Sequence, residues 1–511
     1  MFQSLPEADF SFARRLLPFR HAADQSAPQH EDQDDAVLLP DQEVLVLTAE
    51  PRGEGNAMCV FQGGELSPAR ALGRLPGPGR YAYVCTMPRL LPSSAAPAPA
   101  PAAPAPAPRA WLGKVRGSVS LPPRGLLDWS DRLVFDSAVL HGGDVLVFAK
   151  GLSRSQDPAD VQCLYSADGI VSSFTAVTSA QQVVRCPPPP TFLNSGRVTL
   201  ALKGEEPIPS LATYTLNQST LSVTHGKKNL VCACTMVRDV AKFLHEWVRH
   251  HAAVGVDHFY LYDNGSGDDL ADQVANLQAS GYNISTVAWP WVKTQEAGLS
   301  HCAAMHQTSC EWMAFMDVDE FIFSPHWNNF ERPSKSMLEP LVASLDPQVG
   351  QLYLPCYDFG PSGQTSNPRE GVCQGYTCRL NKVERHKSLV RLDTVDDSLT
   401  NAVHHFDLKP GFHGNWTRLA RINHYKFQAW SEFKSKFKRR VSAYVADWKD
   451  PVNLESGDRA PGLGVDPIEP DGWAKRFCER IDTTMKEVSM KWFGFGGRRQ
   501  TGDISSSPSL R

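Results

Sequence analysis

The sequence Glu311-Trp-Met-Ala-Phe-Met-Asp-Val-Asp-Glu320 runs from an apolar segment directly into a cluster of carboxylates. The apolar segment has the length and composition of a buried strand. Asp317 and Asp319 then leave the strand two residues apart, so both can approach one hard cation. Mg²⁺ and Mn²⁺ take oxygen ligands and usually share their coordination with substrate phosphates. The motif therefore predicts a metal site for a diphosphate, although an acidic pair alone also occurs in solvated turns.

The sequence around this motif alternates between short apolar runs and helical periods. Apolar runs predict strands at 229–235, 258–262 and 284–289, and helical spacing of apolar residues predicts helices at 270–279 and around 298–310. Strand–helix repeats of this kind predict an α/β domain with a mostly parallel sheet. Ligands of such sheets bind beyond the carboxyl ends of the strands.

Polar residues at those strand ends are candidates for nucleotide contacts. Arg238 could clamp a phosphate with its planar guanidinium, or lie on a helix surface. Asp263 could accept hydrogen bonds from a uracil or a ribose, or belong to an Asp-Asn-Gly-Ser-Gly turn. Lys293 and Gln295 could contact the nucleotide or fill a loop. The candidate nucleotide-sugar contacts are therefore Thr235, Arg238, Asp263, Lys293, Gln295 and Asp317.

Histidines and a basic segment follow later in the chain. His404 and His405 are adjacent, and Asn423 precedes His424. An imidazole could complete the metal shell or orient an acceptor hydroxyl, although a single histidine is more often structural. The segment 432–440 places two phenylalanines on one helical face among basic residues. It is either an amphipathic surface helix or a face that contacts phosphate.

The part of the chain before these motifs has a different pattern of apolar residues. Residues 41–225 show short apolar runs between turn signals and no long helical period, which predicts an all-β, sandwich-like domain. Cys163 and Cys186 flank a pair of expected strands, so a disulfide between them is plausible. The Pro- and Ala-rich insertion 92–108 cannot pair in a sheet, because proline lacks the amide donor. Disorder is predicted for residues 1–40 and for the tail 496–511.

Composition limits the class of function. The chain has 511 residues, enough for two or three domains, and its net charge of −4 gives no reason to expect binding to nucleic acid. Its twelve cysteines include no Cys-x-x-Cys pair, so we expect some disulfides, as in a secretory-pathway lumen. Sequons at Asn217, Asn283 and Asn415 point weakly the same way. No apolar stretch is long enough to span a membrane, and the first residues do not read as a signal peptide.

Several ordered motifs over residues 228–450 resemble glycosyltransferase family 92 of plants and animals. They are Cys232-Ala-Cys-Thr-Met-Val-Arg-Asp239, Tyr262-Asp-Asn264, Lys293-Thr-Gln-Glu-Ala297, Phe315-Met-Asp-Val-Asp-Glu-Phe321, Glu384-Arg-His-Lys-Ser388, Val403-His-His-Phe406 and Asn423-His-Tyr425. The resemblance implies a GT-A domain, which we expect over 228–495. It also implies a carbohydrate-binding type of β-sandwich before that domain, and a place in the Golgi or elsewhere in the secretory pathway.

The activity implied by this resemblance is transfer of a hexose, most simply galactose, from a UDP-sugar donor. The acceptor is a hydroxyl of a glycan or polysaccharide, the anomeric centre is inverted, and a divalent metal assists, Mn²⁺ before Mg²⁺. A homo-oligomer is compatible with this function. In the same family-based reading, Asp317 and Asp319 hold the metal and the diphosphate, and Asp263 holds the nucleoside. A disulfide between Cys356 and Cys378 is expected in the catalytic domain.

The remaining roles are assigned as hypotheses. An inverting displacement needs a base, because a neutral hydroxyl is a poor nucleophile. The candidate bases are Asp358, Glu370, Glu384 and one of the histidines; with Asp319, we take Asp358 and Glu384 as the catalytic set. His405 is taken as a third metal ligand. His404, Asn423 and His424 are taken as acceptor contacts or supports.

Two other functions stay open at this point. One is a glycan-binding protein with an inactive transferase domain, against which the retained carboxylates argue. The other is a metal-dependent phosphohydrolase, because paired aspartates also serve such enzymes. That function usually needs a further His and Asp cluster for a second metal, which the sequence does not show.

Overall fold

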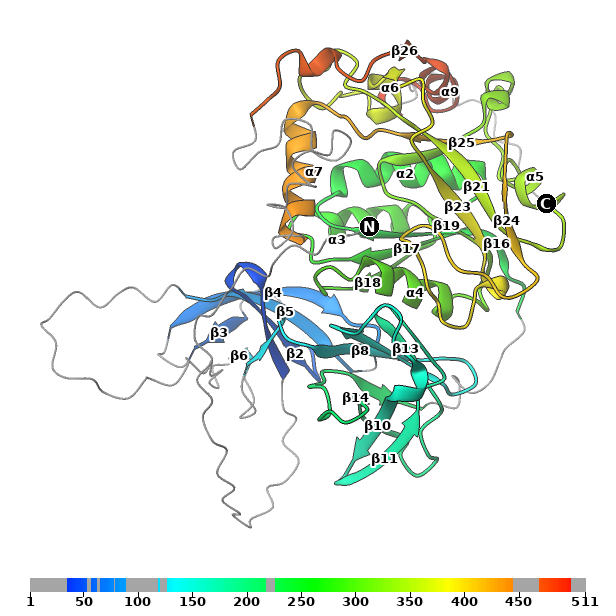
Figure 1. Cartoon of the computed structure of the whole chain (residues 1–511). Helices are drawn as coiled ribbons and strands as arrows, with labels where there is room; N and C mark the ends of the chain where they lie inside the picture. Colours follow the sequence, from blue (N-terminus) through cyan, green and yellow to red (C-terminus); the bar gives the residue numbers. More distant parts are fainter. Residues whose placement is uncertain are drawn as a thin grey trace, which may run out of the picture.

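The computed structural model describes residues 35–52, 57–61, 65–77, 79–88, 118–119, 126–216, 226–443 and 468–497. Figure 1 shows an α/β layer structure in the C-terminal half, with a β-rich N-terminal region packed below it. Residues 1–34, the insertion 92–108 and the tail from 498 lie outside the described residues. Among the described residues, no helix combines the length and the apolar character needed to cross a membrane.

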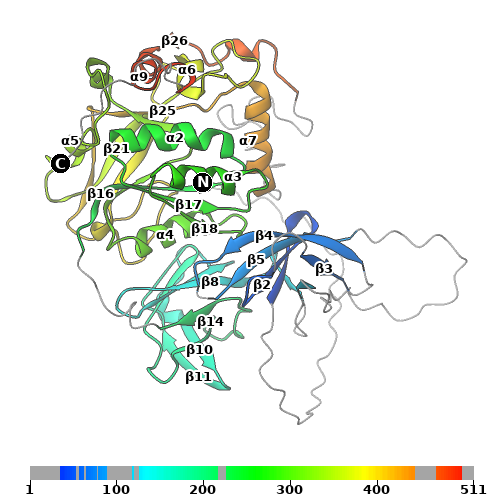
Figure 2. The same ribbon diagram turned by 180° about the vertical axis from the view of Figure 1, so that it is seen from behind.

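The core of the C-terminal half is a sheet that begins with four parallel strands in the order β18-β17-β16-β19. They are β16 (Asn229–Val237), β17 (His258–Asp263), β18 (Ile284–Ala288) and β19 (Cys310–Phe315). Helices α2 (Ala241–Val254) and α3 (Leu270–Ala279) cover one face of this sheet, and α4 (Gln295–Met305) covers the other (Figure 2). The four strands and α3 agree with the predicted ones to within about two residues, whereas α4 begins and ends earlier than the helix predicted around 298–310.

Beyond β19 the sheet becomes mixed. The strand β23 (Arg385–Arg391) runs antiparallel to β19 and to β21 (Val349–Asp358), whereas β25 (Arg421–His424) runs parallel to β21. The edge is formed by β20 (Glu320–Phe323) on β25, and β24 (His413–Trp416) pairs with β21. The predicted, mostly parallel sheet is therefore confirmed only for its first half. Parallel pairing needs long crossover connections, and the segments between these later strands contain few helices.

Further helices complete the C-terminal half. They are α5 (Glu339–Val342), α6 (Val372–Gly375), α7 (Trp430–Ala443) and α9 (Thr484–Phe493). A two-stranded ribbon of β22 (Cys378–Arg379) and β26 (Arg480–Ile481) joins the α9 segment to the rest. The helix α7 corresponds to the basic segment 432–440, and Figure 1 shows it beside the edge where the parallel strands end.

The described residues of the N-terminal region form three sheets. The first has the order β6-β3-β4-β5-β2-β1-β7, formed by β1 (Asp35–Leu39), β2 (Glu43–Thr48), β3 (Met58–Val60), β4 (Leu66–Arg74), β5 (Tyr81–Thr86), β6 (Ser118–Val119) and β7 (Leu127–Asp128). Two four-stranded sheets, β11-β10-β14-β15 and β12-β13-β9-β8, enclose a common apolar core, as in a sandwich. Their strands are β8 (Leu133–Val139), β9 (Val145–Lys150), β10 (Val161–Ala167), β11 (Ile170–Thr175), β12 (Thr178–Ala180), β13 (Val183–Cys186), β14 (Ser195–Leu202) and β15 (Thr213–Thr215).

One terminal prediction needs correction. The predicted disordered segment 1–40 includes β1, whose residues Asp35–Leu39 pair with β2. The apolar run Ala36-Val-Leu-Leu39 pairs with the buried strand β2. This pairing favours a strand in spite of the polar residues that precede it in the sequence. The outer limits of the predicted domains otherwise remain predictions.

Five disulfides join Cys59–Cys85, Cys163–Cys186, Cys232–Cys310, Cys234–Cys302 and Cys378–Cys478. The predicted Cys163–Cys186 pair is confirmed. The predicted Cys356–Cys378 pair is wrong, because Cys356 is free and buried while Cys378 bonds Cys478. The alternation of β21 turns Cys356 into the core with its neighbour Leu354, whereas the β22–β26 ribbon brings Cys378 close to Cys478.

Candidate active site

A cleft opens at the carboxyl ends of the parallel strands, between these ends and α7. Its lining combines loops after β16, β17, β18 and β19 with side chains of α7. The lining residues are Met236, Val237, Arg238, Val240, Phe243, Asn264, Trp291, Lys293, Thr294, Gln295, Glu296, Asp317, Val318, Asp319, Gln428, Glu432 and Lys436. The structure thus brings together five predicted site residues, namely Arg238, Lys293, Gln295, Asp317 and Asp319.

The two aspartates are paired with different cations. Asp317 Oδ2 lies 3.5 Å from Lys387 Nζ and 3.7 Å from His404 Nε2. Asp319 Oδ2 lies 3.3 Å from His424 Nε2 and forms an ion pair with Lys436 of α7. Each aspartate is therefore already compensated by positive charge from another element.

Glu320 is a third carboxylate, and it contacts Asp317 and Lys387 in the interior. It is fully buried, its Oε2 accepts a hydrogen bond from Asp317 N at 2.9 Å, and its Oε1 lies 2.7 Å from Lys387 Nζ. His424 Nε2 is 3.7 Å from the same Oε1. Lys387 thus bridges Glu320 and Asp317, which could not both stay ionised in the interior without it.

The charge balance shifts the pKa values of these groups. Burial alone would raise the pKa of Asp317 and of Asp319, but Lys387 and Lys436 respectively outweigh it and lower both well below the ordinary range. For Glu320 burial prevails over the attraction of Lys387, and its pKa is raised. The aspartates therefore stay carboxylates at neutral pH, which is the form that a cation binds.

His404, rather than the predicted His405, lies beside the aspartates. His405 turns away, with its Nδ1 2.6 Å from Ser388 Oγ and its ring 4.1 Å from the ring of His386. Burial lowers the pKa of His404 to about 3, so its imidazole is neutral and able to ligate. Asp317, Glu320 and His404 form a group whose possible ligand atoms all lie within 4.8 Å of one another. The prediction of His405 as a metal ligand is corrected to its neighbour, because the loop turns between the two rings.

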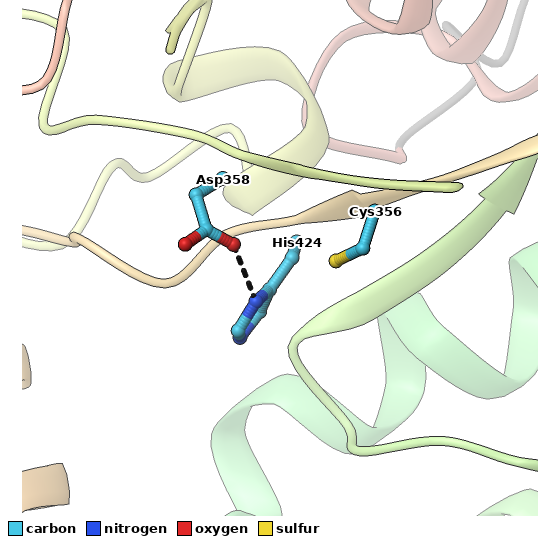
Figure 3. A group of neighbouring side chains, drawn as sticks. All are labelled: Cys356, Asp358 and His424. Carbon is cyan, nitrogen blue, oxygen red and sulfur yellow. Dashed lines mark hydrogen bonds and ion pairs between the residues drawn. The ribbon is translucent and has the colours of Figure 1, made fainter. Parts of the chain in front are cut away.

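Asp358 and His424 form a second, deeper cluster with Cys356 (Figure 3). The Asp358 carboxylate meets His424 Nδ1 at 2.8 Å with one oxygen and Lys426 Nζ at 2.9 Å with the other. Although burial opposes it, the charge of His424 lowers the pKa of Asp358 below its usual range. Burial would lower the pKa of His424, but Asp319 and Asp358 raise it well above the ordinary value. His424 is therefore a protonated, positively charged side chain that lies between the carboxylates of Asp319 and Asp358.

This cluster weakens one predicted role. Asp358 was a candidate base, but both of its oxygens are engaged and its acidity is increased, so it is a poor acceptor for a proton. A metal ion between Cys356, Asp358 and His424 would also have to displace the charge of Lys426 and of the His424 imidazolium. We therefore interpret the cluster as a support that orients His424 toward Asp319.

Other predicted residues lie outside the cleft lining. Thr235 is buried in β16. Asp263 accepts a hydrogen bond from Ser266 N at 2.8 Å, and the next residue, Asn264, lines the cleft instead of Asp263. Glu384 lies 3.6 Å from Lys382 at the surface, and Asn423 is fully buried with its Oδ1 accepting from Arg421. These positions follow from strand alternation and turn geometry, which a motif alone does not reveal.

The structure also adds residues that the sequence did not single out. Lys387 and Lys436 bind the carboxylates, and Glu296 and Glu432 place two more carboxylates in the lining. Lys436 belongs to the basic helix for which phosphate contact was one of two predictions. The alternation of side chains along β23 places Lys387 on the opposite face of the strand from the residues next to it in sequence. It does not show which of the two faces contacts Asp317.

Sequence comparison covers this whole region. A family model for glycosyltransferase family 92 matches residues 227–451, which include the cleft. A family 92 protein of Ricinus communis is 37% identical over 492 residues, covering 90% of this chain and 83% of the relative. One of Arabidopsis thaliana is 36% identical over 502 residues, covering 90% and 82%. This chain belongs to glycosyltransferase family 92.

Membership of family 92 makes the chain a glycosyltransferase. Among solved structures, a mannosyltransferase from Pyrobaculum calidifontis in complex with GDP-Man and Mn²⁺ has a TM-score of 0.25 and 12% identity, covering 45% of this chain and 67% of that one. Residues 1–349 of S. aureus TarS give a TM-score of 0.24 and 10% identity, covering 46% and 75%. Both TM-scores are low. The family 92 assignment therefore rests on the sequence relatives.

Proposed function

We propose that this family 92 enzyme transfers a hexose, most simply galactose, from a UDP-sugar to a glycan hydroxyl with inversion at the anomeric carbon. The observation that carries the proposal is the meeting of Asp317 and Asp319 with Arg238 and Lys436 in one cleft. Carboxylates for a divalent cation and side chains for phosphate are the two groups that a nucleotide diphosphate needs. A GT-A type of catalytic domain fits this placement at the carboxyl ends of parallel strands.

The residues present fit a divalent metal ion. Asp317 and Asp319 would hold it, with His404 as a nearby nitrogen ligand. The possible ligand atoms of Asp317, Glu320 and His404 lie within 4.8 Å of one another, so carboxylate oxygens and an imidazole nitrogen are close enough to share one ion. When bound, such an ion neutralises charge on the diphosphate as it departs. Oxygen ligands favour Mn²⁺ or Mg²⁺, and a nitrogen ligand favours Mn²⁺ of the two.

The side chains of the chain supply the rest of the chemistry. The acceptor oxygen forms a bond to the anomeric carbon while the bond from that carbon to the UDP oxygen breaks, and the acceptor proton passes to a base. Arg238 and Lys436 can accept the diphosphate charge. Lys436 now neutralises Asp319, and it becomes available to a phosphate once Asp319 holds another cation.

We assign the base to Glu296 in preference to the earlier candidates. Glu296 lies in the first turn of α4 and lines the cleft, as does Glu432. Glu432 forms an ion pair with Lys242, which holds its carboxylate toward α2. Glu370 and Glu384 are not among the lining residues of the described cleft, and Asp358 is engaged by two cations.

The proposed location is the lumen of the secretory pathway, such as the Golgi. Five disulfides between ten of the twelve cysteines suit an oxidising compartment, because cytosolic reductants keep most thiols reduced. Glycan acceptors are also found there.

A donor screen tests the function. The purified chain is incubated with Mn²⁺, each of several UDP-sugars and a panel of glycan acceptors, and released UDP and the anomeric configuration of the product are measured. We expect UDP release with one or two donors, most with UDP-galactose, and a product of inverted configuration. A glycan-binding protein with an inactive cleft would retain acceptor but release no UDP, and a retained configuration would reject the proposed displacement.

A further inference from the structure

The wall of the cleft on the side of β17 and β18 consists of two loops that are tied to each other. Asn264, after β17, donates hydrogen bonds from Nδ2 to the carbonyl oxygens of Trp289 (2.8 Å) and Trp291 (3.1 Å), after β18. Thr294 Oγ1 donates to the Trp291 carbonyl at 2.8 Å. Lys293 has a φ of 57°, a conformation that a residue with a side chain keeps only when its surroundings impose it.

The N-terminal β region supplies part of those surroundings. Trp291 is fully buried, and its Nε1 donates a hydrogen bond to Asp136 Oδ2 of β8 at 3.0 Å. The Trp291 ring stacks on Trp129 with centroids 5.9 Å apart. On the other side of the loop, Gln182 Nε2 donates to the Lys293 carbonyl at 3.2 Å. Asp136 of β8, Trp129 and the Gln182 turn between β12 and β13 therefore hold the segment that carries Lys293 and Gln295 into the cleft.

Asp136 is itself fixed. It is 1% exposed, and its Oδ1 forms an ion pair with Arg80 and accepts a hydrogen bond from Ser137 N at 2.8 Å. Arg80 in turn donates to the Leu211 carbonyl at 2.7 Å. A carboxylate held at this many points presents one lone pair to Trp291 in a constant direction. This network has no contact with the metal-binding carboxylates, so it acts only through the loop.

The loop after β17 is supported in the same way. Arg70 of β4 donates to the Ser266 carbonyl at 2.6 Å, next to the turn that holds Asn264. One continuous apolar cluster also includes Phe135 and Phe148 of the N-terminal sheets together with Trp289 and Phe315. Figure 1 shows β4 and β8 directly below β18 and α4. The N-terminal region is therefore packed against the cleft wall rather than joined to the catalytic half by a linker alone.

We propose that the N-terminal β region forms part of the donor site, with Asp136 as a positioning residue that holds the Trp291–Gln295 loop for the nucleotide. The inference rests on the proposed function, because it takes the ligand of this cleft to be a nucleotide sugar. It assigns to the N-terminal region a role in donor affinity that is separate from any binding of a glycan.

The test compares Asp136→Ala with Ser137→Ala in the full chain. Ser137 follows Asp136 on β8, and its Oγ donates to the Thr213 carbonyl of β15 at 2.7 Å, so its removal costs a hydrogen bond that does not involve the loop. Dissociation constants for UDP in Mn²⁺, KM for the UDP-sugar and kcat are measured for both. We expect Asp136→Ala to raise the UDP dissociation constant and the donor KM by roughly three- to tenfold, as for one lost hydrogen bond, with kcat at saturating donor nearly unchanged. Ser137→Ala should lower thermal stability and leave the donor KM as it is.

The opposite results overturn the inference. The inference is wrong if UDP has the same dissociation constant in Asp136→Ala, in Ser137→Ala and in the unchanged chain. Asp136 would then contribute to the fold but not to donor binding. If Asp136→Ala fails to fold, Gln182→Ala decides, because its contact is partly exposed and we expect about a twofold rise in donor KM; no rise rejects the proposal. If the unchanged chain itself binds no UDP in Mn²⁺, the proposed function fails first and this inference falls with it.

Discussion

Lys387 compensates two carboxylates that are otherwise buried side by side. Its Nζ is 2.7 Å from Glu320 Oε1 and 3.5 Å from Asp317 Oδ2, and its side chain is 10% exposed. Lys387→Met keeps most of the volume and removes the charge, so the carboxylates lose their shared partner. We expect the free energy of unfolding in EDTA to fall by roughly 3–5 kcal/mol, as for other broken buried ion pairs.

The control for this prediction is Lys382→Met. The Lys382 side chain is 77% exposed and 3.6 Å from Glu384, so the change should cost less than about 1 kcal/mol. Urea denaturation of both variants measures the difference. Equal stabilities would mean that the carboxylate cluster does not need the charge of Lys387.

Glu296 gives a second prediction at the scale of one residue. Glu296→Gln keeps the shape of the side chain but removes its ability to take a proton from the acceptor. We expect the rate of transfer at saturating substrates to fall by roughly 100-fold or more, with UDP affinity unchanged. Glu370→Gln, outside the cleft lining, should retain activity, and full activity of Glu296→Gln would move the base to Glu432 or another group.

At the scale of elements, α7 contributes a cation to the metal site. Lys436 and a metal ion compete for the same Asp319 carboxylate, so Lys436→Met should bind Mn²⁺ more tightly than the unchanged chain, by roughly threefold or more. Calorimetric titration of the nucleotide-free protein with Mn²⁺ measures this. Lys434→Met, on the same helix but outside the cleft lining, is the matched control; weaker Mn²⁺ binding by Lys436→Met would contradict the competition.

The sequence predicts the elements of the first half of the sheet because their apolar periods are local. It also places Asp317 and Asp319 at the end of a strand, since the apolar run before them is unbroken. It cannot rank His404 against His405, because a turn between adjacent residues decides which ring faces the aspartates. The pairing of Lys387, Glu320 and His424 is likewise hidden, since these residues meet only when β23, β20 and β25 come together in one sheet.

At the scale of the whole molecule, a network around Asp482 fastens the C-terminal segment to the sheet. Asp482 Oδ2 accepts hydrogen bonds from Arg379 Nε at 2.7 Å and from Arg421 Nη2 at 2.8 Å. Burial opposes ionisation, but the hydrogen bond from Arg379 prevails and lowers the pKa of Asp482 to about 2. Because the folded pKa lies below the unfolded value of about 4, this contribution is present above pH 4 and is lost as the pH falls toward 2.

The prediction compares the unchanged chain with Asp482→Asn across this range. At pH 7 the variant should be less stable by roughly 1–2 kcal/mol, a value reduced for partial solvent screening. The difference should shrink as the pH is lowered from about 5 to 2. Denaturation at several pH values checks this, and a difference independent of pH would show that the charge of Asp482 contributes nothing.

The arrangement of the whole chain is less accessible from sequence than its parts. The β-rich texture of the N-terminal region predicts its class, and Cys163–Cys186 follows from two flanking strands. The contact of Asp136 with Trp291 joins residues 155 positions apart and leaves no local pattern. For the same reason the Cys378–Cys478 disulfide, between residues 100 positions apart, could not be chosen over Cys356–Cys378.

The binding of UDP by calorimetry, with Mn²⁺ and with EDTA, tests most directly whether Asp317 and Asp319 seat a cation for the nucleotide. The unchanged chain should bind UDP at least about tenfold more tightly in Mn²⁺ than in EDTA, because the ion joins the diphosphate to the carboxylates. Asp319→Asn should remain folded and lose that gain. If UDP binds equally in both conditions, or if Asp319→Asn keeps the full gain, the central claim about this cleft is wrong.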